Sequence, residues 1–261
     1  MASNLSTLGF VFASEDEFRA AMVRHAAETI GQLACAPGVY GIWRSRSGAE
    51  IWFHLSPSSN GSTEIQGLTP FFEGTCDAKL RITAAIHRDG DNEFEGAFHA
   101  WVSPDESDGG SFPLVFEAVD FATQSEATWP AVRVVRIAAF ARELRAFASE
   151  QAYAESQQGE ASDKFRMAPQ AFIPIGLFAA AMSSEDKKKR EAPSTTALFS
   201  GTVLEHRALT NEATGHSFTR LLIETTEINL EVLADPEVIS GNIVEGGTVE
   251  VTAALFGRFL N

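Results

Sequence analysis

Two long runs of alternating residues, 77–88 and 92–102, constrain the fold of this chain more than any other feature. Alternation of apolar and polar side chains is the pattern of a strand that buries one face. The apolar side chains of both runs stay on one face of a hairpin only if the loop between them is odd in length, because a slip of one residue inverts a strand. A three-residue loop at 89–91 meets this condition and predicts that Ile82 lies opposite Phe98 and Ile86 opposite Phe94. A two-residue Asp-Gly turn sets Ile86 against Glu93 instead, which burial disfavours.

The other face of this hairpin brings polar and aromatic residues into opposed pairs. In the odd register Lys79 lies opposite Trp101, and Arg81 lies opposite His99. Directly opposed side chains of an antiparallel pair are close enough to interact, so Lys79 and Trp101 predict a cation–π contact. Arg81 beside His99 favours the neutral form of the imidazole.

A second stretch, at 48–55, places an indole and an imidazole in the phase where a half-buried strand carries polar residues. If this strand shares a sheet with the hairpin, Trp52 and His54 project from the same face as the opposed pairs. The predicted ligand-binding surface then consists of Trp52, His54, Lys79, Arg81, His99 and Trp101.

Three interpretations of this surface stay open. In the first, a helix at 138–158 covers the surface, and both Trp side chains belong to a second core layer, since buried aromatic residues dominate cores. Alternatively it is an open cleft, because aromatic walls with a few polar groups are typical of ligand sites. A metal bound by His54 and His99 lacks an obvious third ligand, so we predict no metal site.

The remaining N-terminal pattern is mixed. A short strand is expected at 8–13, followed by a helix that Ser14 caps and Glu17 supports in a capping box. The apolar stripe of this helix runs at three- and four-residue spacing from Phe18 to Leu33. Strand-like runs separated by turn residues predict antiparallel sheet from 39 to about 121, another strand at 131–137 and the helix at 138–158. The fold class is therefore α+β, with residues 1–182 forming a largely antiparallel sheet with two helices.

Two segments follow that domain or close it. Residues 170–178 form an apolar arm, which either docks into its own domain or mediates self-association. The side chains of the predicted interaction arm are Phe172, Ile173, Ile175, Leu177 and Phe178. Residues 183–193 are charged and predict a linker, in which the basic run 187–190 is a solvated tether between acidic neighbours.

The last part of the chain, 194–261, shows four strand-like runs with a possible helical turn between the third and the fourth. A barrel of about five short strands with a helical turn before the penultimate strand resembles the OB-fold. The last run is long enough to bend into two strands, which completes the resemblance. Segments such as "FARELRAF" and "QAFIPIGLF" also resemble conserved bacterial proteins of unknown function, a resemblance that implies no activity.

Charge and missing motifs exclude several functions. The formal net charge is −15, from 35 acidic and 20 basic side chains, which disfavours nucleic acid and anionic membranes as partners. The predicted barrel carries no lysine after the linker and only three arginines, whereas single-stranded nucleic acid requires a cationic groove. Two cysteines are too few for a disulfide framework or a thiolate zinc site. A secretory signal, an apolar run of membrane-spanning length and the common phosphate-loop, dinucleotide, zinc-protease and hydrolase motifs are all missing.

These observations predict a cytoplasmic, non-catalytic interaction protein that binds a protein partner or itself, without catalytic residues, metal or cofactor. One alternative is a small-molecule enzyme in which His54 or His99 is the general acid/base and Glu50 or Glu95 orients it. The other alternative is an OB-type binder of single-stranded nucleic acid, which the charge disfavours.

Overall fold

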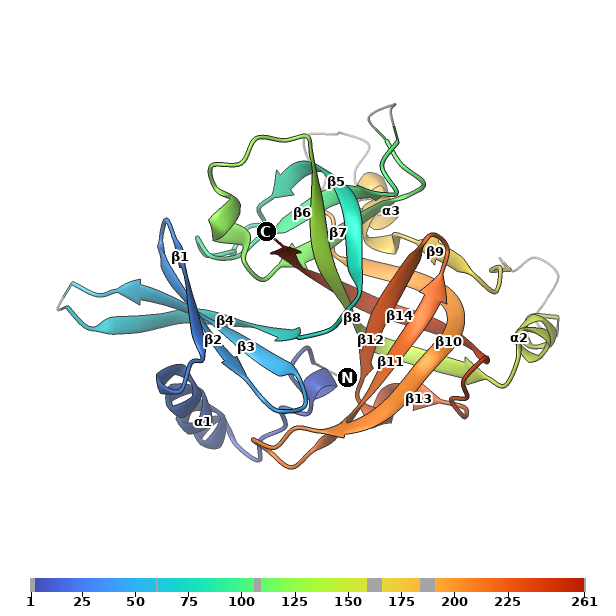
Figure 1. Cartoon of the computed structure of the whole chain (residues 1–261), viewed down its shortest axis with the longest axis horizontal. Helices are drawn as coiled ribbons and strands as arrows, with labels where there is room; N and C mark the ends of the chain where they lie inside the picture. The colour runs from blue at the N-terminus through green and yellow to red at the C-terminus, as the bar shows by residue number, and fades with distance from the viewer. Residues whose placement is uncertain (1–2, 60, 106–108, 159–165, 184–190, 261) are drawn as a thin grey trace.

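The structure is a computed structural model that describes residues 3–59, 61–105, 109–158, 166–183 and 191–260. Within these ranges it contains α-helices α1 (Glu15–Ala27), α2 (Glu150–Ser156) and α3 (Ile175–Met182) and two β-sheets. The fold class is therefore α+β, as the sequence predicts. Figure 1 shows the smaller sheet with α1 on one side of the molecule and the larger sheet on the other.

The smaller sheet, sheet A, is an antiparallel meander in the order β1-β2-β3-β4. Its strands are β1 (Gly31–Cys35), β2 (Gly38–Arg44), β3 (Ala49–Pro57) and β4 (Thr63–Phe72). Helix α1 begins at the predicted cap, because Ser14 accepts a hydrogen bond from the Glu17 amide at 3.2 Å, while the Glu17 carboxylate accepts from the Ala13 amide at 2.8 Å. The antiparallel sheet and the α1 cap are both confirmed.

The larger sheet, sheet B, contains all remaining strands of the described chain. They are β5 (Asp77–Ile86), β6 (Ala97–Val102), β7 (Pro113–Ala118), β8 (Ala131–Phe147), β9 (Ala171–Ile173), β10 (Thr196–Thr210), β11 (Ser217–Thr225), β12 (Ile228–Ala234), β13 (Ile239–Ser240) and β14 (Thr248–Leu260). The long strands β8 and β14 pair antiparallel from Phe147↔Thr248 to Val134↔Leu260 and run through the middle of the sheet (Figure 1).

Sheet B closes into two rings of strands that share β8 and β14. The N-terminal ring follows the pairings β5–β6–β7–β14–β8 and returns to β5, and β7 lies parallel to β14. The C-terminal ring follows β10–β11–β12–β8–β14 and returns to β10, and β12 lies parallel to β8. Each half of sheet B has three antiparallel strands, a 3₁₀ turn and one long strand, and in the C-terminal half the two-residue strand β13 follows the turn. The turns are η2 (Phe121–Gln124) and η4 (Pro236–Val238).

The shared strands face two hydrophobic cores. On β8, Ala139 and Ala141 belong to the core inside the rings, whereas Ala138 and Phe140 belong to the core between the rings and sheet A. Phe140 packs against Phe256 of β14 in that second core, with 4.6 Å between ring centroids. Apolar side chains that project from the outer face of β8 and β14 therefore hold sheet A against the rings.

This double burial explains why the helix predicted at 138–158 is wrong. Strand β8 continues to Phe147, and only Glu150–Ser156 is helical. A strand that is buried on both faces shows no period of two, and the Ala, Leu, Arg and Glu residues of this segment favour helix locally. Pairing with β5, β12 and β14 overrides that preference. The strand expected at 8–13 is also wrong, since the chain forms the 3₁₀ turn η1 (Ser6–Leu8) and then an irregular segment.

The register predicted for the 77–102 hairpin is wrong as well. Arg81 lies opposite Trp101 and Ile82 opposite Ala100, and the register shifts at the irregularity between Ile82 and Ala84. Residues 87–96 form a long connection instead of a three-residue loop, because Phe94 leaves the strand and packs on sheet A. Trp101 lies opposite Arg81 instead of Lys79, and on β8 the residue opposite Lys79 is Val134.

The four strands and the helical turn predicted for the C-terminal part are confirmed. Strand β14 is one continuous strand of 13 residues, so the expectation that it bends into two is wrong. The fifth strand of the C-terminal ring is β8, which precedes the predicted linker at 183–193. Strands on both sides of that linker therefore pair in one sheet. Its residues 184–190, including the basic run 187–190, lie outside the described residues.

Candidate functional site

The structure divides the predicted ligand-binding residues between the two sheets. Trp52 and His54 lie on β3 of sheet A, where both are buried. Lys79, Arg81, His99 and Trp101 lie on β5 and β6 of sheet B. The six residues do not share one sheet face, although Arg81 and Trp101 are directly opposed. His99 contacts the Thr83 hydroxyl at 2.5 Å through Nδ1, and burial lowers its pKa.

His54 fixes the connection between β5 and β6 on sheet A. Its ring stacks on Phe94 with 5.2 Å between centroids, and its Nε2 lies 3.1 Å from the Thr69 hydroxyl. Burial lowers the pKa of His54 to about 4, so the imidazole is neutral at physiological pH. Beside it, the Tyr40 hydroxyl donates to the Phe94 carbonyl at 2.6 Å and accepts from the Ala122 amide at 2.9 Å. Sheet A thus positions both residues 92–95 and the turn η2.

Between these segments lies a pocket of about 570 Å³, which we call the aromatic pocket. It is bounded by the β1–β2 turn, the β5–β6 connection and η2. The side chains that give it its character are Phe98, Phe121, Trp129, His87, Glu93 and Gln124. Phe98 packs against Trp129 with 5.2 Å between centroids, and His87 meets Phe121 edge to face at 4.7 Å.

A smaller space of about 150 Å³, the inter-sheet cavity, lies where sheet A meets β14 and η2. Leu33 and Trp52 of sheet A, Asp120 and Thr123 at η2, and Arg258 and Phe259 of β14 line it. Gln124 lines both this cavity and the aromatic pocket. The two spaces are therefore neighbours on either side of η2.

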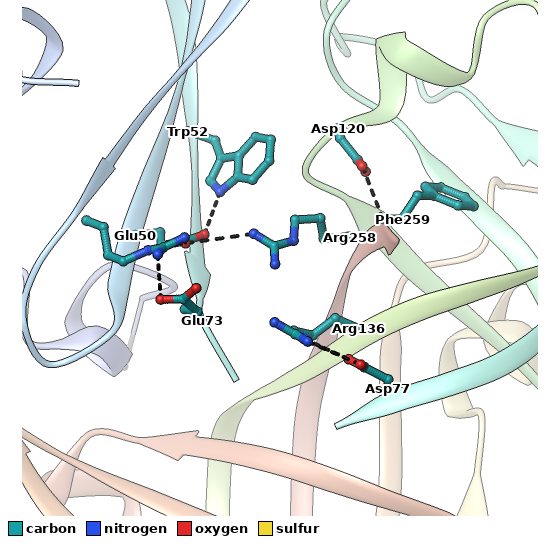
Figure 2. A network of polar contacts seen from close by, with 9 residues as sticks. Glu50, Trp52, Glu73, Asp77, Asp120, Arg136, Arg258 and Phe259 are labelled. Carbon is teal, nitrogen blue, oxygen red and sulfur yellow. Dashed lines mark hydrogen bonds and ion pairs between the residues drawn. The ribbon is translucent and has the colours of Figure 1, made fainter. Parts of the chain in front are cut away.

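A chain of charged groups connects Glu73 through Glu50 to Arg258 (Figure 2), and Arg258 lines the inter-sheet cavity. Glu50 has no exposed surface, and it accepts hydrogen bonds from Arg44 at 2.7 Å and from the Trp52 indole at 2.8 Å. Arg44 also pairs with Glu73 at 2.6 Å. Arg258 lies farther away, with 4.0 Å between its Nη1 and Glu50 Oε1, and its guanidinium stands over the Phe71 ring.

Asp120 is the most unusual titratable group in this region. Its side chain is 3% exposed, and Oδ2 accepts a hydrogen bond from the Phe259 amide at 3.1 Å. Within the described part of the chain, Oδ1 has no hydrogen-bond partner. Burial raises the pKa of Asp120 to about 7, against smaller opposing effects from the Phe259 amide and Arg258. A buried group with this pKa, set in a cavity, is a candidate functional residue.

Sequence reasoning missed Asp120 and Arg258, because they are far apart in the chain and form no motif. One signal was visible: Asp120 stands between Val119 and Phe121 in an otherwise apolar run. For Arg258 the comparable signal is a single cation within the apolar end of the chain.

Neither the side-chain clusters and helices of the structure nor comparison with known proteins assigns an activity to these sites. No three metal-binding side chains cluster within the described ranges. Among the helices of the same ranges, none combines the length and apolar character needed to cross a membrane. Comparison with protein-family models, curated proteins and solved structures finds no match.

Proposed function

We propose that this protein is a non-catalytic binding protein that holds a small, mostly apolar molecule in the aromatic pocket. The observation that carries the proposal is the pocket itself, about 570 Å³ in volume with Phe98, Phe121 and Trp129 in its wall. Ligand sites are commonly apolar spaces of about 300–1,000 Å³ with a few polar groups that orient the ligand. His87, Glu93 and Gln124 supply such groups.

Three observations favour binding over catalysis. His54 and His99, the candidate general acid/bases, line neither the aromatic pocket nor the inter-sheet cavity. Glu50, a candidate to orient a catalytic histidine, is engaged by Arg44 and Trp52. Glu95 lies 3.7 Å from His54 Nδ1, but that imidazole is enclosed by sheet A and Phe94.

The proposal is tested with the fluorescent probe 1-anilinonaphthalene-8-sulfonate, which brightens in apolar sites. Titration of the full chain is expected to show one saturable site. Ala85→Trp puts an indole into the aromatic pocket from an exposed position and is expected to weaken probe binding at least tenfold. Ala208→Trp is the matched control, because Ala208 is also an exposed strand residue but lies on β10. Equal probe affinity in both variants contradicts the proposal.

We also propose that the two rings are OB-like barrels. The N-terminal ring contains five strands, and the turn η2 precedes its penultimate strand β8, which is the arrangement that resembles the OB-fold. The C-terminal ring has the same content, with its fifth strand supplied by β8. A role in binding single-stranded nucleic acid stays the less favoured hypothesis, because the chain carries a formal net charge of −15.

Self-association is a second candidate function, supported by the predicted arm. Its strand β9 pairs with β10, and Phe172 stacks on Phe112 and Phe199, so this half of the arm docks on its own sheet. Its helix α3 leaves Phe178 56% exposed and Met182 85% exposed, one helical turn apart. Light scattering of wild type and of the variant Phe178→Ser/Met182→Ser tests this role. A dimer that the variant dissociates supports it, and equal molar masses contradict it.

A further inference from the structure

We propose that the inter-sheet cavity is a binding site for a small monocarboxylate, which Arg258 holds by its guanidinium and Asp120 holds by a donated hydrogen bond. This inference is independent of the ligand proposed for the aromatic pocket. It rests on two polar groups that face one cavity, one a donor set with unused hydrogen-bonding capacity and the other a buried carboxyl oxygen without a partner.

Arg258 is the expected anchor for an anion. Its side chain is 17% exposed, and the one ion pair that it makes with a described residue, Glu50, spans 4.0 Å, which is too long for a hydrogen bond. Glu50 already accepts hydrogen bonds from Arg44 and Trp52, so its carboxylate interacts only weakly with Arg258. The Arg258 guanidinium therefore makes no hydrogen bond to a described side chain. A planar guanidinium with unused donors fits the two oxygens of a carboxylate.

Asp120 supplies the second contact. An ionised carboxylate buried without a full set of partners is costly, and it is relieved by protonation or by a donor from a ligand. The Phe259 amide satisfies Oδ2, which leaves Oδ1 for a ligand. When protonated, Asp120 donates an O–H to a carboxylate oxygen, which is among the stronger hydrogen bonds in proteins.

The charges around Asp120 are few and come from three elements. Arg258 on β14 favours the ionised form, and Glu50 on β3 lies beyond Arg258. Tyr40 on β2 also faces Asp120, and burial raises the pKa of its phenol so that it stays neutral. The residues of η2 in the cavity, Thr123 and Gln124, carry no charge. Protonation of Asp120 is therefore governed by burial, and an anion bound between it and Arg258 favours the protonated form further.

The size and lining of the cavity select the ligand. A volume of about 150 Å³ corresponds to about five water molecules, which suits an anion of a few heavy atoms. Leu33, Trp52 and Phe259 provide apolar walls for a short carbon chain. A phosphate dianion fits less well, because Arg44, the next cation, is occupied by Glu50 and Glu73.

Binding by this scheme takes up a proton at Asp120, so it weakens as pH rises. Acetate is fully ionised above pH 6, so its own titration does not interfere. With the pKa of free Asp120 at about 7, the protonated fraction falls roughly twentyfold between pH 6.5 and pH 8.5. The apparent affinity for acetate is expected to fall by the same factor.

The test is a titration of the ¹⁵N-labelled full chain with sodium acetate, with sodium chloride added to keep ionic strength constant. The readout is the cross-peak of the Trp52 indole, which lines the cavity. We expect a saturable shift at pH 6.5 and roughly twentyfold weaker binding at pH 8.5. Absence of a saturable shift at pH 6.5, or an equal shift with chloride alone, overturns the proposal.

Three variants separate the two contacts. Asp120→Asn keeps a neutral donor, so it is expected to bind acetate with equal affinity at both pH values. Arg258→Lys keeps the charge but loses the planar fork, and we expect at least tenfold weaker binding. Arg207→Gln removes a cation from an exposed position on β10 and is the control, with affinity unchanged. Wild-type affinity in Arg258→Lys, or an undiminished pH dependence in Asp120→Asn, overturns the proposal.

Discussion

Replacing Asp120 by Asn changes the pH dependence of stability in a direction that the structure fixes. The folded chain holds the Asp120 proton more tightly than the unfolded chain does, because burial raises the pKa from its ordinary value near 4 to about 7. Between these two values the folded state binds more protons, so the free energy of unfolding falls as pH rises. Asparagine has no proton to lose, so the variant is free of this effect.

The magnitude follows from the two pKa values. A shift of one unit corresponds to about 1.4 kcal/mol, and the full shift at this buried site corresponds to about 4 kcal/mol. Between pH 5 and pH 8 the wild type is expected to lose about 2.5 kcal/mol more of its unfolding free energy than Asp120→Asn. The Asn side chain still accepts the hydrogen bond of the Phe259 amide, so the folded geometry is kept.

The assay is urea unfolding at pH 5 and pH 8, followed by tryptophan fluorescence. Comparing the variant with the wild type at each pH cancels the titration of every other group, including His54. Asp89→Asn is the control, because Asp89 is exposed and its loss removes the same formal charge. If the stability difference between Asp120→Asn and wild type is equal at both pH values, Asp120 is not the buried, protonating group that the structure describes.

The remaining predictions concern other buried groups. His54 has a pKa of about 4 in the fold and an ordinary one near 6.5 in the unfolded chain, so the unfolding free energy of the wild type falls by about 3 kcal/mol as pH falls from 7 to 4. His54→Phe should lack this loss in acid titrations followed by circular dichroism, and an identical acid transition in both proteins contradicts the prediction. Arg44→Gln leaves Glu50 without its main cation and should lower the free energy of unfolding in urea by about 3 kcal/mol. The double variant Arg44→Gln/Glu50→Gln should recover part of this stability, and no recovery argues against the ion pair as the cause. Cys76 is buried with its pKa raised to about 12, so at pH 8 iodoacetamide should modify half-buried Cys35 first and Cys76 only on unfolding, as mass spectrometry of the peptides will show.

Local signals in the sequence were sufficient for elements that depend on neighbouring residues. The Ser14 cap, strands β2, β3 and β4 of sheet A and the four C-terminal strands follow from capping chemistry and alternation, and all of them are present. Strand β1 was missed, because Ile30 and Leu33 continue the helical spacing, whereas α1 ends at Ala27. The turn η4 follows in the same way from Asp235 and Pro236. These features need no knowledge of distant parts of the chain.

The rings could not be predicted, because their shared strands β8 and β14 each pair with several strands that are distant in the sequence. The first part of β8 was predicted as a strand at 131–137, but residues 138–147 have the composition of a helix, and their periodicity does not reveal that they pair with β12 and β14. The hairpin register failed for a similar reason, since Phe94 packs on sheet A and not in its own strand. A period of two describes one buried face, and these segments have two.

The candidate sites were missed to a greater extent than the strands. The predicted surface assumed that Trp52 and Trp101 share a sheet, whereas they belong to different sheets. The aromatic pocket and the inter-sheet cavity exist only because sheet A docks beside η2. Local sequence patterns do not predict how two sheets dock on each other. Of the six predicted residues, Trp52 is the one that lines the inter-sheet cavity, and it does so from a buried position.

The space between η2, the β5–β6 connection and the β1–β2 turn is the ligand site that we propose. A crystal structure of the full chain grown with saturating 1-anilinonaphthalene-8-sulfonate tests this claim most directly. We predict electron density for one probe molecule between Phe121 and Trp129, with its polar end near His87 or Gln124. A probe bound elsewhere, with Phe121 and Trp129 in contact and the pocket closed, contradicts the account.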